Sequence, residues 1–440
     1  MQKTTPKKPA VTLVPRQVAL AILLRLFTER TPLQEALEIR EFQRLSPDNR
    51  AFVRMLVTTT VRYYGALNAI LSAHLQKPLP KKTEVAHFIL LLGIAEGIFL
   101  KTPDYAVASN TVELLKKKRF VGLAGLGNAI MRKILADAES IQQRYTTPEN
   151  LLPAWLLTKL QQAYGIETTD KIVAAQLAIP PLDLTCFGVQ EDWARRLAGD
   201  ILNERTLRLQ SADKIDVLPG FSEGAWQVQD VAASLPTLLF GTDLTGKTVI
   251  DLCAAPGGKS VQLAKAGATV IAVESSEPRA KRLMENARRM GVFSKITVKW
   301  VDMLNWQPDA LVDAVLLDAP CSATGTLRRH PDVAWHKQSA DIPVLQDLQK
   351  TMIAKAATFL KVGGILVYAT CSLLPEEGED VVEHFLSMNT NFARIAPEPN
   401  EEAPYSAFLN STGDLRTLPC YLPNKGGMDG FYAARLVRRS

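Results

Sequence analysis

The chain has 440 residues, 47% of them hydrophobic and 22% charged, which is typical of a globular protein with room for two or three domains. Its five cysteines form no CxxC pair and no regular spacing, so neither a disulfide scaffold nor a metal site is expected. The basic, polar first residues and the absence of an apolar run of membrane-spanning length predict a cytoplasmic protein without a membrane partner.

The first part of the chain predicts an all-α domain over residues 1–145. Apolar residues recur at helical spacing from Pro15 to Asp137, and Ser46 and Thr102 stand where helix caps are expected. Residues 1–150 contain 22 Lys and Arg against 12 Asp and Glu (+10), whereas the rest contains 29 against 33 (−4). The basic excess predicts a surface that meets a polyanion, and a solvated basic surface explains it equally well.

Residues 146–225 predict a small α+β connector. Two helical stretches, AWLLTKLQQAYG (154–165) and DKIVAAQLAI (170–179), precede a strand, LDLTCF (182–187), and a further helix over 192–202.

Residues 226–440 predict an α/β, Rossmann-like domain. From Thr248 onward strands and helices alternate, which is typical of a parallel sheet covered by helices on both faces. FYAARLV (431–437) is expected to be a terminal strand. The predicted fold class is therefore multidomain: an all-α bundle, an α+β connector and an α/β domain.

A glycine-containing turn, DLCAAPGGKS (251–260), follows the first strand of the α/β part. It matches neither GxGxxG nor a phosphate loop, so a dinucleotide or ATP site is not favoured. Glu274 ends the next strand, where an acid binds both ribose hydroxyls, and Asp302 ends the third, where it meets the adenine. These features predict an adenosine site without a pyrophosphate clamp, and S-adenosyl-L-methionine is the favoured ligand.

Two cysteines stand at the ends of neighbouring strands, in DAPCSATG (318–325) and ATCS (369–372). Carbon 5 of a pyrimidine accepts a methyl group only after a thiolate has added to carbon 6, which is a form of nucleophilic catalysis. A carboxylic acid at N3, such as Asp318, stabilises the charge that builds up in the ring. A second thiol, such as Cys321, suits removal of the C5 proton and release of the attacking thiol. Cys186, Cys253 and Cys420 are expected to be packing residues.

The blocks DLCAAPGGKS, DAPCSATGTLRRHPDVAWH (318–336) and GGILVYATCSLLPEEGEDVVEHFL (363–386) resemble the signature motifs of the Nop/Sun family of RNA cytosine-5 methyltransferases. The helical part, with SPDNRAFVRMLVTTTVRYYGALNAIL (46–71) and LGNAIMRKIL (126–135), resembles the NusB-like RNA-binding domain of bacterial 16S rRNA enzymes of the RsmB/Sun (Fmu) type.

This resemblance implies C5-methylation of a cytosine in 16S rRNA, alone or in the small ribosomal subunit, with no obligate protein partner. It implies that Cys371 is the nucleophile and that Cys321 aids product release, with Asp318 as the third catalytic residue. The implied cofactor residues are Cys253, Ala254, Ala255, Pro256, Gly257, Gly258, Lys259, Glu274, Asp302 and Asp318. Glu274 stands where the family often has Asp.

Two other functions remain open from the sequence: a tRNA cytosine-5 methyltransferase, and a NusB-like RNA-binding factor whose methyltransferase domain is inactive. The intact Asp318, Cys321 and Cys371 favour an active enzyme. The candidate RNA contacts are the basic residues at Lys116–Arg119, Arg132 and Lys133, and the loop residues Arg328, Arg329 and Asp332.

Overall fold

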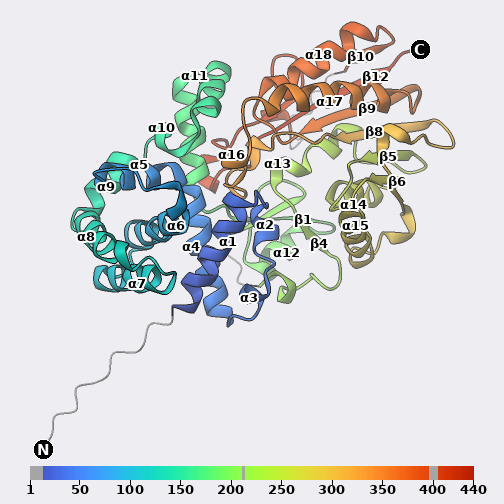
Figure 1. The fold of residues 1–440 in the computed structure, drawn as a ribbon. Coiled ribbons are helices and arrows are strands. Elements are labelled where there is room, and N and C mark those ends of the chain that lie inside the picture. Colours follow the sequence, from blue (N-terminus) through green and yellow to red (C-terminus); the bar gives the residue numbers. More distant parts are fainter. Residues whose placement is uncertain (1–12, 211–213, 396–404) are drawn as a thin grey trace, which may run out of the picture. The chain divides into compact units, whose positions relative to one another are not determined.

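The computed structural model describes residues 13–210, 214–395 and 405–440 (Figure 1). The chain divides into two compact units, which we call the helical unit and the sheet unit. The helical unit runs to Thr158 and also includes His330–His336, and the sheet unit comprises Lys159–Arg329 and Lys337–Ser440. Over the described ranges, no helix is both long enough and apolar enough to cross a membrane.

The helical unit is all-α, as predicted. Its helices are α1 (Val14–Thr28), α2 (Leu33–Ala36), α3 (Arg40–Gln43), α4 (Pro47–Arg62), α5 (Tyr64–His74), α6 (Glu84–Ile94), α7 (Asp104–Lys117), α8 (Ala124–Leu135), α9 (Ala138–Tyr145), α10 (Pro148–Leu151) and α16 (Val333–His336). A π-helical turn, Ala95–Phe99, follows α6. One apolar core, built mainly from α1, α4, α6, α7 and α8, holds them together.

Two predicted helix caps have different outcomes. The Ser46 hydroxyl accepts a hydrogen bond from the Asn49 N–H at 3.4 Å, which caps α4 as predicted. The prediction for Thr102 is wrong, because α7 begins one residue later, after Pro103, and has no side-chain cap. Asp104 instead places a carboxylate in the first turn of α7, where the helix dipole favours negative charge.

The segment His330–His336 lies far from the rest of the helical unit in sequence, but it is part of its core. Trp335 donates from Nε1 to the Val61 carbonyl at 3.0 Å, and its ring meets Tyr64 edge-on at 5.1 Å. The His336 ring bonds the Leu26 carbonyl at 2.9 Å, and Asp332 accepts from the Leu33 N–H at 3.0 Å. These contacts satisfy buried backbone groups at helix ends, so the segment belongs structurally to this unit.

The sheet unit contains, among its described residues, a four-stranded sheet in the order β2-β3-β1-β4, with all pairs antiparallel. Its elements are α11 (Ala154–Leu177) from Lys159 onward, which is broken at Gly165, then β1 (Leu182–Cys186), α12 (Gln190–Leu197), β2 (Asp200–Ile201), β3 (Thr206–Leu209), β4 (Trp226–Val228) and α13 (Val231–Ser234). The segment contains both helices and strands, as predicted, with a small core around Trp226. The predicted helix over 192–202 is wrong in its second half, because α12 ends at Leu197 and β2 follows, and β4 and α13 lie beyond the predicted boundary at residue 225.

The larger sheet of the same unit has, over the described residues, eight strands in the order β10-β12-β9-β8-β5-β6-β7, with β11 paired to β12. Its elements are β5 (Thr248–Leu252), α14 (Gly258–Lys265), β6 (Thr269–Glu274), α15 (Glu277–Arg289), β7 (Ile296–Trp300), β8 (Val312–Asp318), α17 (Asp341–Ala357), β9 (Leu360–Thr370), α18 (Glu379–Met388), β10 (Phe392–Arg394), β11 (Leu415–Thr417) and β12 (Phe431–Arg438). A short 3₁₀ turn, Pro375–Glu377, precedes α18.

The prediction of a parallel sheet holds for β5 to β9 and is wrong for the C-terminal strands. β12 pairs antiparallel with β9, and β10 and β11 pair antiparallel with β12. β12 reaches the sheet without a long crossover helix, so nothing forces it to run parallel to β9. β10 follows α18, runs in the same direction as β9 and pairs with the reversed β12. The sheet is mixed, and its parallel strands carry the glycine-containing turn (251–260) and the two cysteine segments (318–325 and 369–372).

Alternate residues of each parallel strand face two separate cores, as the two-residue period of a strand requires. Val249 faces the core shared with α14 and α15, and its neighbour Ile250 faces the core shared with α17 and α18. Figure 1 shows these helix pairs on opposite faces of the sheet. Both faces are thus sealed, and the loops at the carboxyl ends of the strands are left as the place where a ligand can bind.

Candidate active site

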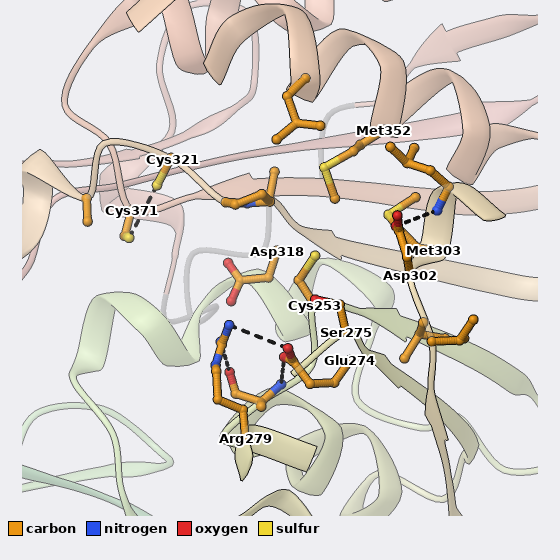
Figure 2. Close-up of a pocket in the computed structure, with 18 residues that line it drawn as sticks. Cys253, Glu274, Ser275, Arg279, Asp302, Met303, Asp318, Cys321, Met352 and Cys371 are labelled. Carbon is orange, nitrogen blue, oxygen red and sulfur yellow. Dashed lines mark hydrogen bonds and ion pairs between the residues drawn. The ribbon is translucent and has the colours of Figure 1, made fainter. Parts of the chain in front are cut away.

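A cavity of about 530 Å³ lies at the carboxyl ends of the parallel strands (Figure 2). The loops after β5, β6, β7, β8 and β9 all contribute to it. It brings together seven of the predicted site residues: Cys253, Ala255, Glu274, Asp302, Asp318, Cys321 and Cys371. Residues that the sequence placed up to 118 positions apart thus share one cavity.

The turn after β5 shapes the floor of this cavity. Cys253 adopts a left-handed φ of 61°, and Gly257, at φ 100°, packs so closely on α15 that a Cβ there would come within 2.9 Å of Leu283. Cys253 and Ala255 line the cavity, whereas Ala254, Pro256, Gly257 and Gly258 form the turn without lining it.

Glu274 closes β6 and is almost fully buried, at 2% exposure. One carboxylate oxygen accepts from the Ser276 N–H at 3.0 Å and the other from the Ala255 N–H at 3.3 Å. Arg279 of α15 lies 3.6 Å from the same carboxylate and donates to the Ala255 carbonyl at 2.8 Å. The Glu274 carboxylate is therefore held by the loops after β5 and β6, and it lines the cavity (Figure 2). Each of its oxygens can accept a further hydrogen bond.

Asp302 lies two residues beyond the end of β7 and is exposed at the cavity rim. Its carboxylate caps the following turn by accepting from the Leu304 N–H at 3.0 Å and the Asn305 side chain at 3.1 Å. Glu274 and Asp302 thus stand at the ends of adjacent strands, as expected for an adenosine site.

The two sulfur atoms of Cys321 and Cys371 lie 3.5 Å apart (Figure 2). A hydrogen bond to the Cys371 sulfur, burial, and the charge of Cys371 together raise the pKa of Cys321 well above its usual value. Cys321 therefore keeps its proton at neutral pH, and either sulfur can be the donor in the contact between the two thiols.

An ion pair lies beside the thiols. The Lys259 ammonium donates to the Asp318 carboxylate at 2.7 Å and lies 4.9 Å from the centre of the Phe431 ring. Burial alone would lower the pKa of Lys259, but the charge of Asp318 and its hydrogen bond, with smaller effects from Asp251 and Cys371, raise it. Lys259 is therefore a fixed positive charge that interacts with both Asp318 and Cys371.

The other cysteines lack this environment. Burial is the main cause that raises the pKa of Cys253 to about 12 and that of Cys186 to about 11. Burial also raises the pKa of Cys420. Thiols of this kind stay protonated and unreactive, as expected for packing residues.

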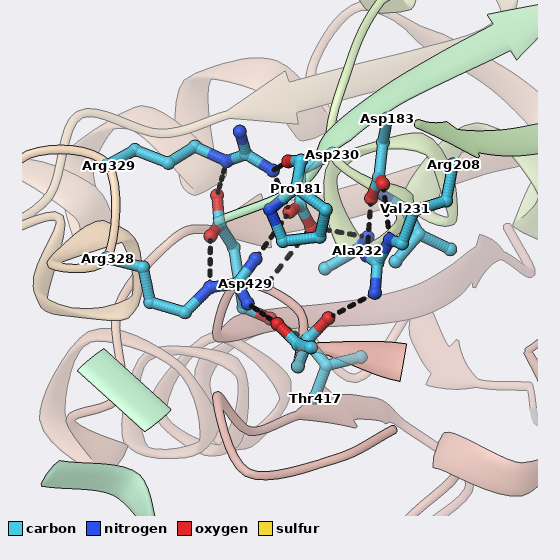
Figure 3. A network of polar contacts seen from close by, with 12 residues as sticks. Pro181, Asp183, Arg208, Asp230, Val231, Ala232, Arg328, Arg329, Thr417 and Asp429 are labelled. Atoms are coloured by element: carbon cyan, nitrogen blue, oxygen red, sulfur yellow. Dashed lines mark hydrogen bonds and ion pairs between the residues drawn. The ribbon is translucent and has the colours of Figure 1, made fainter. Parts of the chain in front are cut away.

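The prediction that Arg328 and Asp332 contact RNA is wrong, because both side chains are buried. Arg328 has no exposed surface and bridges Asp230 and Asp429, and Arg329 binds the same two carboxylates at 2.7 and 3.3 Å (Figure 3). The two arginines anchor the loop after Cys321 to the C-terminal segment before β12.

A second buried ion pair reinforces this anchor (Figure 3). Arg208 of β3 and Asp183 of β1 have no exposed surface, and two hydrogen bonds of 2.6 and 2.7 Å join them. Arg208 also donates to the carbonyls of Lys425 and Gly427. The small sheet thereby fixes the segment that carries Asp429.

Several lining residues were not predicted. Arg279, Ser275, Met303, Leu348 and Met352 also face the cavity. Arg279 could have been found from its position in the first turns of the helix after Glu274. Leu348 and Met352 lie one turn apart on α17, and this spacing is the same as that of apolar residues on any helix that packs on a core. The sequence therefore did not distinguish them as cavity residues.

Comparison with known proteins agrees with this architecture. Residues 242–437 match the model of the 16S rRNA methyltransferase RsmB/F family, and residues 14–136 match that of the NusB family. The chain is 32% identical to "Ribosomal RNA small subunit methyltransferase B" of Pasteurella multocida, over 98% of this chain and 97% of that protein. The protein of the same name from Serratia proteamaculans is 33% identical, over 90% and 92%.

Among solved structures, the crystal structure of the protein PH0851 has the same fold. Its TM-score is 0.76 at 20% identity, and the match covers 98% of this chain and all of that one. With the cavity, the helical unit and the near-full-length relatives taken together, the chain belongs to the RsmB/F family of 16S rRNA methyltransferases.

Proposed function

We propose that this protein uses S-adenosyl-L-methionine to methylate carbon 5 of one cytosine in 16S rRNA, in the cytoplasm, through a covalent bond from Cys371 to carbon 6. The observation that carries the proposal is the pair of thiols 3.5 Å apart beside the Asp318–Lys259 ion pair, in a cavity that also holds two strand-end acids. This combination supplies a nucleophile, a second thiol and an acid within one pocket.

The part of the cavity lined by Glu274 and Asp302 fits the adenosine group of the proposed cofactor. Glu274 would bind the ribose hydroxyls, and Asp302 at the rim would bind the adenine, with Met303 and Leu304 as apolar neighbours. When bound, S-adenosyl-L-methionine supplies an electrophilic methyl group. The residues of the turn after β5 shape the floor of the cavity that would hold it.

The proposed reaction begins when the Cys371 thiolate forms a bond to carbon 6, which moves the electrons of the C5=C6 bond to carbon 5. Asp318, in its carboxylic acid form, donates a hydrogen bond to N3, where negative charge builds up in the ring. Carbon 5 then becomes nucleophilic enough to accept the methyl group. Lys259 holds Asp318 in place and keeps a positive charge near Cys371.

Release requires a base for the C5 proton, and Cys321 suits this task. Two of the causes that raise its pKa are the hydrogen bond to Cys371 and the charge of Cys371. Both are lost once the Cys371 sulfur is bonded to carbon 6, so Cys321 then loses its proton to solvent more readily. The Cys321 thiolate takes the C5 proton, the C5=C6 bond re-forms, and Cys371 leaves as a thiolate. One proton is released to solvent per turnover.

The helical unit is proposed to bind the RNA. Lys116–Arg119 at the end of α7, and Arg132 and Lys133 at the end of α8, are exposed. Lys116 pairs with the neighbouring Glu113, in an exposed contact of little energetic value. Exposed cations of this kind bind phosphates, and they make the affinity for RNA fall steeply with salt.

The experiment is bisulfite sequencing of rRNA and tRNA from a strain that lacks the gene and from the same strain complemented with it. One cytosine of 16S rRNA should lose its protection in the deletion strain and regain it on complementation. Loss confined to a tRNA would indicate the tRNA enzyme. No loss at any cytosine would reject cytosine-5 methylation and favour an RNA-binding factor.

A further inference from the structure

We infer that Glu377 is a positioning residue that sets the distance between the two thiols. It ends the 3₁₀ turn after Cys371 and has no exposed surface. Its carboxylate accepts from the Ser322 N–H at 2.8 Å, from the Ser372 hydroxyl at 2.6 Å and from the Gln349 amide at 3.1 Å. The Ser322 hydroxyl is a fourth donor to the same group. One carboxylate therefore joins three separate segments of the sheet unit.

The position of these donors in the sequence gives Glu377 its effect on the sulfur atoms. Ser322 directly follows Cys321, and Ser372 directly follows Cys371. The carboxylate thus holds the residue next to each thiol, one in the loop after β8 and one in the loop after β9. A change of either loop relative to Glu377 changes the distance between the sulfurs.

Further bonds make the clamp a closed network. The hydroxyls of Ser322 and Ser372 lie 3.2 Å apart, and Thr324 lies 3.3 Å from each of them. Thr324 also accepts from the Leu373 N–H at 2.9 Å. The Gln349 amide, which donates to Glu377, also donates to the Pro320 carbonyl at 2.9 Å. Such networks hold a single geometry because any shift leaves a buried polar group unpaired.

The simpler explanation is that Glu377 only stabilises the fold. The two explanations differ in what they predict for the thiols: a positioning role changes the reaction of Cys321 with Cys371 in protein that is still folded. The effect on catalysis rests on the proposed function, whereas the effect on the thiol–thiol geometry does not.

The experiment compares the full-length wild type with Glu377→Ala, Glu377→Gln and the control Glu376→Ala. Glu376 is the adjacent acid and forms a partly exposed ion pair with Lys159 outside the network. Each protein is treated with diamide, which takes two electrons and two protons from the thiol pair and leaves a disulfide. The Cys321–Cys371 peptide is quantified by mass spectrometry over time. Thermal unfolding, cofactor affinity, kcat and KM for RNA are measured in parallel.

We expect Glu377→Ala to cross-link more slowly and to lose about 100-fold in kcat, the loss that a misplacement of about 1 Å produces, with KM and cofactor affinity unchanged. Glu377→Gln keeps one oxygen acceptor and should show a smaller loss in both the cross-linking rate and kcat. Glu376→Ala should match the wild type. Should Glu377→Ala fail to fold, Glu377→Gln carries the comparison.

Wild-type cross-linking rates in folded Glu377→Ala and Glu377→Gln would overturn the inference. A loss of kcat that only follows the loss of folded protein or of cofactor affinity would also overturn it. A wild-type protein that methylates no cytosine would reject the proposed function, while the cross-linking series would still test the position of the thiols.

Discussion

Replacing Cys321 by alanine should trap the protein on its RNA. In the proposed reaction Cys371 forms the bond to carbon 6, and Cys321, 3.5 Å away, takes the C5 proton that must leave before the bond can break. Cys321→Ala removes that base and leaves the nucleophile, Asp318 and Lys259 in place. Addition and methyl transfer should continue, and release should become much slower.

The size of the effect follows from the contribution of one positioned base. General acid–base catalysis contributes about 10²- to 10⁴-fold, so release should slow by at least about 100-fold. If release and the preceding steps take equal time in the wild type, about half of the RNA-bound protein is covalently linked. A 100-fold slower release raises that fraction to about 99%.

The assay is denaturing gel electrophoresis of protein incubated with end-labelled 16S rRNA fragments and S-adenosyl-L-methionine, followed over time. Cys321→Ala should give a stable shifted band, whereas Cys371→Ala and the double variant should give none. Cys420→Ala is the matched control and should behave as the wild type. A shifted band with Cys371→Ala and none with Cys321→Ala would exchange the two roles. No band in any variant of a protein that methylates cytosine would refute the covalent route.

Three further predictions concern the cofactor, pH and stability. Glu274→Gln removes the charge proposed to bind the ribose and should weaken cofactor binding about 10- to 100-fold in calorimetry, given about 1.5–3 kcal/mol for hydrogen bonds to charged groups; an unchanged Kd would contradict this role. Burial raises the pKa of Asp251 to about 7, so its proton stabilises the folded state below about pH 4, and this stabilisation is lost as the pH rises to 7. Asp251→Asn should therefore gain on the order of 4 kcal/mol over the wild type between pH 4 and 7 in thermal melts, with no further gain above pH 7, and a constant difference would refute the burial argument. Trp335→Ala should destabilise the helical unit by about 3 kcal/mol in urea titrations, because it removes the ring beside Tyr64 and the bond to Val61, and Val344→Ala, an exposed control, should change little.

Much of the fold could be predicted because it depends on local patterns. The helical spacing before Asp137 and the alternation after Thr248 predict the correct classes of structure, and the cap predicted at Ser46 is confirmed. The parallel order of β5 to β9 also placed the loops that carry Glu274, Asp318 and Cys371 at one edge of a sheet. Strand ends and turn residues are local features, so the sequence identified them.

The features that were missed depend on which distant segments meet. Arg328 and Arg329 looked like exposed basic residues, and only the fold shows that Asp230 and Asp429 bind them. The role of Glu377 could not be predicted, because it stands in an acidic turn that looks exposed in the sequence. Its burial depends on the loops after two different strands. The antiparallel β12 was equally hidden, because a strand pattern does not reveal the direction of its neighbour.

The place of His330–His336 in the helical unit has a consequence for the order in which the protein is made. The ribosome finishes the rest of that unit at Thr158, but Trp335 emerges about 180 residues later, which is about 9 to 36 s at 5–20 residues per second. During that time the carbonyl of Val61 and the N–H of Leu33 lack the partners that Trp335 and Asp332 later supply. The helical unit is therefore completed only after the Cys321 loop of the sheet unit has been made. The helical unit should be more sensitive to protease in a nascent chain stalled before residue 330 than in one stalled late enough for residue 336 to have left the ribosomal exit tunnel.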